Sequence, residues 1–365
     1  MEHILDLTKQ RVTELIASLQ KKGQPEIKAD QLFRELYKAQ TLNPTHWDGV
    51  SLKLIKHLQE SYDFSPLEID EVSVSEFDAS AKFIFKLQCG LLVESVLIPE
   101  KSHFTLCVSS QVGCAQGCTF CQTGRMGLKK SLSTAEIVGQ LFQAQIWLNE
   151  NKDLYEKTHK LFQISNIVFM GMGEPLDNLD NVLSSIEIFT DSKGFNLSPN
   201  KITVSTVGLL PQLERFLNER PSCLALSLHS PFEEQRSRVM PVNKRSPLPK
   251  VLKAMRRLQP HFNRPYMIQY TLLRGVNDSI EHAEELVKLL SDMKVKINLI
   301  PLNEHEGAAF RRPDLNNIYQ FQQYLKEKGF VTTVRLSKGR DIEAACGQLI
   351  KKKLDAKKKT VTEEV

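Results

Sequence analysis

Residues 114–121 read CAQGCTFC, which sets Cys114, Cys118 and Cys121 in one short loop with C-x3-C-x2-C spacing. Thiolates are soft ligands that suit iron–sulfur clusters and zinc. A four-iron cluster normally takes four cysteine ligands, and this loop offers three. One iron would then stay open to a substrate or a cofactor, so the spacing predicts a 4Fe-4S cluster with one open coordination site.

Two alternatives stay open from the spacing alone. One is a zinc site that His103 or Cys107 would complete, and the other is a set of reduced thiols without metal. Cysteine-rich zinc sites usually show two C-x2-C pairs, and this sequence has no second pair.

Length and cysteine usage limit the class of protein. The 365 residues allow one large domain and one small domain. The first residues, Met1–Asp6, have neither a basic region nor an apolar core, and no apolar run is long enough to span a bilayer, so we expect no secretory signal and no membrane segment. Seven cysteines, an odd number with three in one loop, favour a reducing, cytoplasmic compartment over a disulfide framework.

The net charge of +5 is unevenly distributed. The segment from Gln235 to Asn277 contains no Asp or Glu. Its basic residues are Arg236, Arg238, Lys244, Arg245, Lys250, Lys253, Arg256, Arg257, Arg264 and Arg274. This acid-free stretch indicates a phosphate-bearing polymer as partner, with a basic surface that binds nothing as the alternative.

The hydrophobic period divides the chain into four parts. Residues 1–70 predict short helices of an accessory, RNA-binding domain, and residues 71–102 predict a β-hairpin extension that turns at Cys89-Gly90. Residues 103–350 alternate strand and helix, which predicts an α/β fold with parallel strands in a partial TIM-like (β/α)6 barrel. The basic tail, residues 351–365, is expected to be disordered.

Glu94 is a carboxylate on an otherwise apolar strand face, which it shares with Leu92, Val96 and Ile98. Burying an acid is costly, so such a residue is usually paired or functional. The alternative is an acid at a strand edge that reaches solvent.

Polar residues follow the predicted barrel strands, where active sites of such barrels lie. They are Gly173 and Glu174 in the loop GMGEP, Ser205, Ser227 with Leu228 and His229, and Asn303. Each has a structural alternative, such as a helix-capping serine or a core histidine. Their common position at one rim predicts a single site.

Two further thiols flank this barrel. Cys107 lies on the first predicted strand and Cys346 follows the last one, so the two can meet at the same rim. The alternative is that each is a small buried apolar residue, although Cys346 lies among charged and glycine residues that suit an exposed, reactive thiol.

Four segments together resemble the RlmN/Cfr family of radical SAM RNA methyltransferases. They are CVSSQVGC (107–114), GMGEP (171–175), SLH (227–229) and AACGQL (344–349). The resemblance covers about residues 20 to 350 and implies a radical SAM barrel that carries a 4Fe-4S cluster and uses two molecules of S-adenosylmethionine (SAM) per turnover.

The resemblance also implies residue roles. Cys346 would take a methyl group from a first SAM, and a radical derived from a second SAM would abstract hydrogen from that methyl. The carbon radical would add to an adenine ring carbon, Glu94 would accept the ring proton, and Cys107 would attack the Cys346 sulfur to release the methylated RNA and leave a transient disulfide. Cys114, Cys118 and Cys121 would hold the cluster, and the SAM contacts would be Gly173, Glu174, Ser205, Ser227, Leu228, His229 and Asn303.

The family leaves the attacked carbon open. An RlmN-like member would methylate adenine C2 in 23S ribosomal RNA and in transfer RNA, whereas a Cfr-like member would methylate C8 of the same ribosomal adenosine and confer antibiotic resistance. A third possibility is a non-catalytic iron–sulfur or zinc RNA-binding protein. We expect a monomer that receives electrons from a donor such as flavodoxin or ferredoxin.

Overall fold

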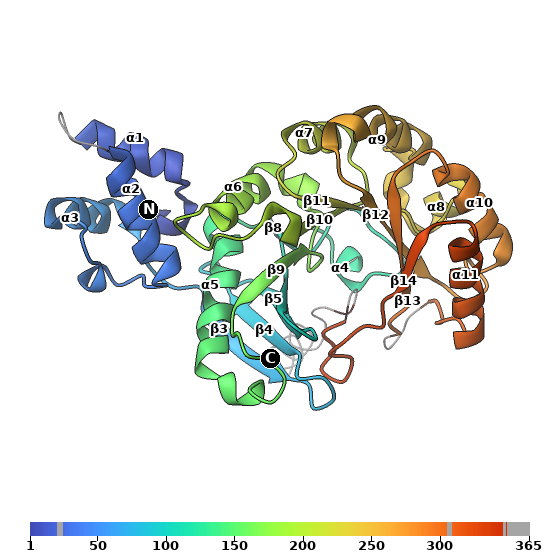
Figure 1. Ribbon diagram of the computed structural model, residues 1–365, viewed down its shortest axis with the longest axis horizontal. Coiled ribbons are helices and arrows are strands. Elements are labelled where there is room, and N and C mark those ends of the chain that lie inside the picture. The colour runs from blue at the N-terminus through green and yellow to red at the C-terminus, as the bar shows by residue number, and fades with distance from the viewer. Residues whose placement is uncertain (20–24, 305–308, 346–347, 349–365) are drawn as a thin grey trace, which may run out of the picture.

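The computed structural model describes residues 1–19, 25–304, 309–345 and 348, so the basic tail lies outside the described part. A ten-stranded sheet, in the order β14-β13-β12-β11-β10-β9-β6-β5-β4-β3, curves through the larger part of the molecule (Figure 1). Its parallel strands are β6 (Phe104–Val108), β9 (Ile164–Phe169), β10 (Ile202–Thr206), β11 (Cys223–Ser227), β12 (Tyr266–Leu272), β13 (Val295–Pro301) and β14 (Val331–Val334).

Helices connect these strands and cover the outer face of the sheet (Figure 1). They are α5 (Thr134–Glu150), α6 (Leu179–Thr190), α7 (Leu210–Glu219), α8 (Glu233–Val239), α9 (Leu248–Phe262), α10 (Ile280–Leu290) and α11 (Leu315–Glu327). The expected partial (β/α)6 barrel is confirmed: six strand–helix units are followed by a seventh parallel strand.

Alternation along each strand separates the core from the barrel interior. In β10, Ile202, Val204 and Thr206 are buried, whereas Thr203 and Ser205 are half-buried. The apolar set packs beneath the helices, because successive side chains of a strand point to opposite faces. The other set points inward, which is why polar side chains can line the interior of an otherwise apolar sheet.

The expected hairpin is present as β4 (Ala81–Lys86) and β5 (Leu92–Pro99). A strand that the sequence analysis did not predict, β3 (Glu68–Val74), pairs with β4. All three are antiparallel, and β5 pairs with β6, so the extension continues the barrel sheet. The division of the chain at residues 70 and 102 stays a prediction.

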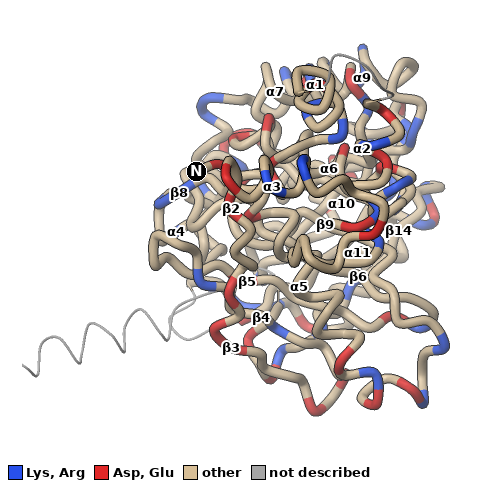
Figure 2. Tube along the Cα trace, turned by 90° about the vertical axis from the view of Figure 1, so that its left-hand side faces the viewer, with Lys and Arg blue, Asp and Glu red and all other residues tan. Residues whose placement is uncertain are grey.

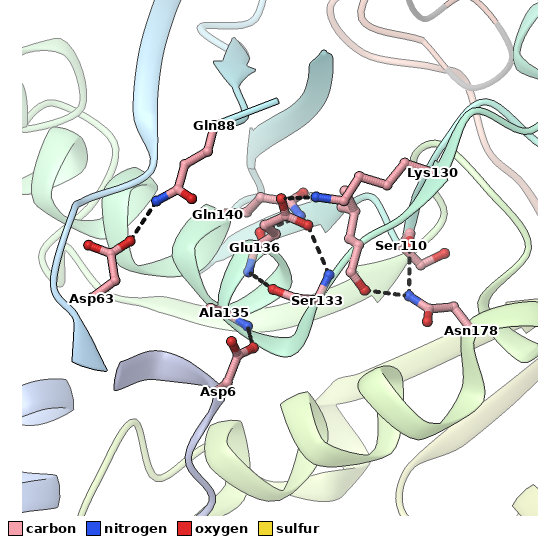
Figure 3. Close-up of polar contacts among 11 residues, drawn as sticks. Asp6, Asp63, Gln88, Ser110, Lys130, Ser133, Ala135, Glu136, Gln140 and Asn178 are labelled. Atoms are coloured by element: carbon pink, nitrogen blue, oxygen red, sulfur yellow. Dashed lines mark hydrogen bonds and ion pairs between the residues drawn. The ribbon is translucent and has the colours of Figure 1, made fainter. Parts of the chain in front are cut away.

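The N-terminal helices lie at one end of the molecule, beside α5 and α6 (Figure 1). They are α1 (Lys9–Leu19), α2 (Pro25–Phe33) and α3 (Leu52–Ser61). A carboxylate oxygen of Asp6 accepts a hydrogen bond of 2.6 Å from the backbone N–H of Ala135, which fastens the N-terminal segment to the start of α5 (Figure 3). On the face that carries these helices, basic and acidic residues are interspersed (Figure 2).

In the folded protein, basic residues of the acid-free stretch pair with acidic residues from other segments. Arg256 pairs with Asp292 at 2.8 Å, and Arg257 pairs with Glu214 at 2.7 Å. Both acids come from segments that lie outside the stretch. The interpretation of Arg236 as a phosphate contact is wrong, because its side chain is fully buried.

Candidate active site

The cluster loop, residues 113–126, begins in a small ribbon at the carboxyl end of β6. In this ribbon β7 (Gln111–Val112) pairs with β8 (Lys130–Ser131). Gly113 has φ of +77°, and a Cβ there would lie 1.8 Å from the carbonyl oxygen of Gly127. Only glycine permits this crossing, and the crossing closes the base of the loop.

The three cysteines of the loop line one cavity of about 160 Å³ at the carboxyl ends of the barrel strands. Burial raises the pKa of the Cys114 thiol to about 12 and also raises the pKa of Cys118. These thiols therefore stay protonated at neutral pH unless a cationic group binds them. Within the described ranges, no three His, Cys, Asp or Glu side chains converge as a single metal ion requires.

The zinc site that His103 would complete is not supported by this geometry. His103 precedes β6, and its imidazole contacts the side chain of Asn166 at 3.1 Å. The five residues of β6 separate His103 from the cluster loop. At about 3.3 Å per residue, this strand spans roughly 16 Å, so His103 lies at the wrong end of β6.

Glu174 joins the loops that follow β9 and β10. Its Oε1 accepts hydrogen bonds from the Thr206 hydroxyl at 2.6 Å and from the Leu176 N–H at 3.2 Å. Its Oε2 accepts a bond of 3.0 Å from the Val207 N–H. Burial nevertheless raises the pKa of this carboxyl group to about 7. Glu174 is thus a buried acid on the cavity wall whose ionisation changes around neutral pH.

The expected serines meet inside the barrel. The hydroxyls of Ser205 and Ser227 lie 3.4 Å apart, and Ser205 donates to Oε1 of Gln269 at 3.0 Å. All three side chains line the cavity, as does Asn303. Two hydroxyls and two amides thus form a polar wall that suits carboxylate and ribose groups of a ligand.

His229 is held as a neutral imidazole. Its Nδ1 accepts the backbone N–H of Thr271 at 2.9 Å, so the ring proton is on Nε2. Burial lowers the pKa of His229 to about 3. The ring meets Phe120 of the cluster loop edge to face, with centroids 4.9 Å apart. In contrast, Leu228 is fully buried, and its side chain belongs to the core.

Glu94 and Cys107 share one face of the sheet. The register pairs Val96 of β5 with Cys107 of β6, so Glu94 lies two residues from the position opposite Cys107, on the same face. Diagonal neighbours of this kind are about 7–8 Å apart. The register of β6 and β9 pairs Cys107 with Val168, and the same face continues to Met170, which lines the cavity. Both side chains are buried and point into the barrel.

A buried hydrogen-bond network supports the strands that carry Glu94 and Cys107. The Oε1 of Gln140 accepts hydrogen bonds from the Ser109 N–H at 2.8 Å and the Ser95 hydroxyl at 2.5 Å, and its Nε2 donates to the Ser109 carbonyl at 3.0 Å. The Ser109 hydroxyl donates to the Glu94 carbonyl at 2.6 Å and accepts the Met172 N–H at 2.8 Å. The ends of β5 and β6 and the GMGEP loop are therefore held in one arrangement.

Asn178 secures the two ends of the cluster loop. Its amide nitrogen donates to the carbonyls of Ser110 at 2.9 Å and Leu132 at 2.8 Å (Figure 3). These residues flank the ribbon on either side, so one side chain holds both the entry to the loop and its exit.

Comparison with known proteins identifies related chains. Residues 108–290 match the model of the radical SAM superfamily. The dual-specificity RNA methyltransferase RlmN of Geobacter sulfurreducens is 43% identical over 358 residues, covering 98% of this chain and 95% of the relative. The protein of the same name from Campylobacter lari is 40% identical over 364 residues, covering 96% and 97%. The crystal structure of a radical SAM methyltransferase from Sphaerobacter thermophilus superposes with a TM-score of 0.85 at 36% identity, covering 95% of this chain and 99% of that one.

The chain belongs to the RlmN family of radical SAM RNA methyltransferases. Membership implies a 4Fe-4S cluster and SAM, and the cavity fits both. Three thiols lie on one wall, and a carboxyl group, two hydroxyls and two amides lie on the others. In the described part of the chain, no helix is both long and apolar enough to cross a bilayer.

Cys346 lies outside the described residues, but the segment that leads to it is described. A carboxylate oxygen of Asp341 accepts the Ser75 hydroxyl at 2.8 Å, and the other accepts the Glu76 N–H at 3.2 Å. The Gly339 N–H donates to Asp78 at 2.8 Å. We call this set the seam, because it joins the β3–β4 turn to the chain that follows β14. It connects the two edges of the open sheet.

The sequence analysis missed several residues of the cavity. Gln269 interrupts the apolar strand YMIQYTL, which was a usable signal, and its amide contacts both Ser205 and the Met170 sulfur. Arg335, directly after β14, also lines the cavity. No sequence pattern marked Arg335 as a cavity residue, because a basic residue that follows a strand is usually exposed to solvent.

Proposed function

We propose that this enzyme methylates C2 of an adenosine in the peptidyl transferase centre of 23S ribosomal RNA and C2 of an adenosine next to the anticodon in transfer RNA. The printed name of the relatives, dual-specificity RNA methyltransferase RlmN, supports this proposal. The observation that carries the chemistry is the common inward face of Glu94 and Cys107 beside the cavity.

An adenine C2 or C8 carbon is a poor nucleophile, so direct transfer of a methyl cation from SAM to it would fail. In the proposed reaction the Cys346 thiolate first attacks the methyl carbon of one SAM and displaces S-adenosylhomocysteine, which leaves Cys346 as a methyl thioether. A covalent route of this kind divides one difficult step into easier ones. When bound, the cluster and a second SAM supply the radical that removes a hydrogen atom from the methyl group.

The remaining steps belong to Glu94 and Cys107. After the methylene carbon of Cys346 bonds to the ring, the ring radical would give up one electron, which the cluster could take back, and Glu94 accepts the proton of that ring carbon. The Cys107 thiolate then attacks the Cys346 sulfur, which forms a disulfide and breaks the bond between sulfur and the transferred carbon; that carbon takes up a proton and becomes the methyl group. An external reductant restores both thiols. Burial of Glu94 suits it to the uptake of a proton, because desolvation favours the neutral acid.

We assign the cofactor contacts residue by residue. Cys114, Cys118 and Cys121 hold the cluster and leave one iron for SAM. Gly173 and Glu174 face the amino group of SAM. The carboxylate and ribose of SAM contact Ser205, Ser227, His229, Asn303 and the backbone of Leu228.

The proposed partners follow from this chemistry. A flavodoxin or a ferredoxin supplies electrons, the enzyme acts as a monomer, and residues 1–70 form an accessory domain that contacts RNA. The division into this domain, an extension over 71–102 and a barrel over 103–350 is part of the proposal.

The test is mass spectrometry of nucleosides after anaerobic incubation of the reconstituted protein with SAM, a reductant and either ribosomal RNA or transfer RNA. 2-Methyladenosine in both RNAs is the expected product. 8-Methyladenosine would move the enzyme to the Cfr-like chemistry with the same catalytic residues. Methylation of ribosomal RNA alone would remove transfer RNA from the proposal.

Two variants test the covalent route. Cys346→Ser should abolish product, and methylation that persists would refute the role of this thiol. Cys107→Ala should accumulate a protein–RNA adduct, and its absence would refute the resolving role of Cys107. Cys223→Ala is the matched control, because this half-buried thiol lies on β11 at the end opposite the cavity.

A further inference from the structure

Arg236 of α8 is a fully buried arginine that the proposed reaction does not use. Within the described part of the chain, no ion pair joins its guanidinium to a carboxylate, and its hydrogen bonds go to neutral oxygens. The Glu233 carboxylate acts on this charge at longer range, across the Asn243 side chain that contacts both residues. A buried cation whose direct partners are all neutral is costly to the fold, so this arginine calls for a functional explanation.

The guanidinium joins two loops of the SAM site. Its Nε donates to the Leu228 carbonyl at 3.0 Å, and its Nη2 donates to the carbonyls of Ser227 at 3.1 Å and Val207 at 3.0 Å. Its Nη1 donates to the side-chain oxygen of Asn243. The planar guanidinium group thus binds the loops that follow β10 and β11 at the same time. A lysine ammonium group, which is a compact point charge, cannot reproduce this set of hydrogen bonds.

The same helix also holds the cluster loop. The Val239 carbonyl, one turn after Arg236, accepts the Thr119 N–H at 3.0 Å and the Thr119 hydroxyl at 3.3 Å. Just beyond α8, Arg245 donates to the Gln116 side chain at 3.0 Å. Gln116 and Thr119 lie on either side of Cys118, so the segment 233–245 contacts both the cluster loop and the SAM loops.

The charge has a natural counterpart in this family. A 4Fe-4S cluster held by three thiolates is anionic overall, and its reduction adds a further negative charge. Burial lowers the pKa of Arg236 to about 10, so the group is still a cation at neutral pH. A fixed cation beside such a site stabilises the more negative, reduced state.

We propose that Arg236 is a positioning residue that holds the loops after β10 and β11 against the cluster loop, and that its buried charge makes the cluster easier to reduce. This inference rests on the proposed cluster and SAM residues. It is independent of which RNA, or which adenine carbon, is methylated.

The test separates geometry from charge in reconstituted protein without RNA. Arg236→Lys keeps the positive charge but loses the planar set of guanidinium donors, whereas Arg236→Met loses both the charge and the donors. Arg238→Met is the matched control on the same helix, because the Arg238 side chain is 75% exposed and pairs with Glu234 on the surface. Three quantities are measured: iron per chain, the SAM dissociation constant, and the cluster midpoint potential from a redox titration followed by electron paramagnetic resonance.

Both Arg236 variants should weaken SAM binding by about tenfold or more, the effect of losing one or two charged hydrogen bonds. Only Arg236→Met should shift the midpoint potential to a more negative value. The Arg238 control should match the unaltered protein. Unchanged SAM affinity in Arg236→Lys would overturn the positioning role, and an unchanged potential in a fully loaded Arg236→Met would overturn the role of the charge.

Glu233→Gln provides a second test if Arg236→Met does not take up iron. It removes the carboxylate whose charge reaches Arg236 across Asn243 and should shift the midpoint potential to a less negative value; an unchanged potential there would overturn the charge role. An unaltered enzyme that binds SAM and shows a reducible cluster, yet makes no methyladenosine, would refute the proposed function and leave the role of Arg236 standing.

Discussion

Replacing Gln140 by methionine should destabilise the protein, because the backbone N–H and C=O of Ser109 would both lose the side chain to which they are hydrogen-bonded. Gln140 is fully buried and forms hydrogen bonds with both the N–H and the C=O of Ser109. Methionine has a similar length and volume, but its side chain has no N–H donor and its sulfur is only a weak acceptor. The change therefore tests the hydrogen bonds with little effect on packing.

The magnitude follows from the two backbone groups that lose their partner. A buried polar group without a partner costs about 1–3 kcal/mol. We count only the two backbone groups of Ser109 and leave out the Ser95 hydroxyl, which also loses its acceptor. The free energy of unfolding should thus fall by about 2–6 kcal/mol.

Urea denaturation under anaerobic conditions, followed by circular dichroism, measures this change as the shift of the midpoint multiplied by the slope. Gln323→Met is the matched control, because its side chain lies on the exposed face of α11 and donates a hydrogen bond of 3.1 Å to Glu327. The control should change stability by less than about 0.5 kcal/mol. Equal midpoints for the two variants would refute the reasoning.

Three further predictions concern the cavity and the seam. SAM binding should weaken by about tenfold per pH unit as the pH falls below 7, because the pKa of Glu174 is raised to about 7 and only its ionised form accepts hydrogen bonds at both oxygens; His229, with a pKa lowered to about 3, should contribute nothing between pH 5 and 8. Gly124→Ala should lower the iron content, because the added Cβ would lie 3.0 Å from the backbone nitrogen of Cys118. Asp341→Ala should lower the free energy of unfolding by about 1–3 kcal/mol, since two donors of the β3–β4 turn lose their acceptor.

Each of these has a control. Isothermal titration of Glu174→Gln should show SAM affinity that no longer varies with pH, and a persistent slope would assign the proton to another group. Gly194→Ala, where the nearest atom to the new Cβ is 3.4 Å away, should retain its iron. Asp180→Ala removes a carboxylate that is 84% exposed and should leave stability nearly unchanged; an equal loss in both Asp variants would contradict the role of the seam.

The barrel was predictable because its signals are local. The strand Cys223–Ser227 is a short apolar run ending in a polar residue, and the structure begins and ends it at those residues. The strand Glu68–Val74 was missed because its register shifts between Ile69 and Glu71, which breaks the period of two. The cysteine loop was visible from its spacing, although the spacing alone left a zinc site and metal-free thiols open.

What the sequence could not provide is long-range pairing. Arg236 and Arg257 look alike in the acid-free stretch, yet one is buried among backbone carbonyls and the other forms an ion pair with Glu214 on the surface. The common face of Glu94 and Cys107 likewise depends on the register of β5 against β6, which no single strand reveals. These contacts join elements that are far apart in the sequence, so no local sequence pattern predicts them.

The seam has a consequence for the order in which the chain folds during synthesis. Ser75 and Asp341 are 266 residues apart, so the β3–β4 turn leaves the ribosome long before its partner exists. At about 5–20 residues per second, the delay is roughly 13–53 s. Throughout that time the β3–β4 turn lacks this acceptor. The seam forms only when the segment that precedes Cys346 has emerged, so the two edges of the sheet are joined after all of its strands have been made.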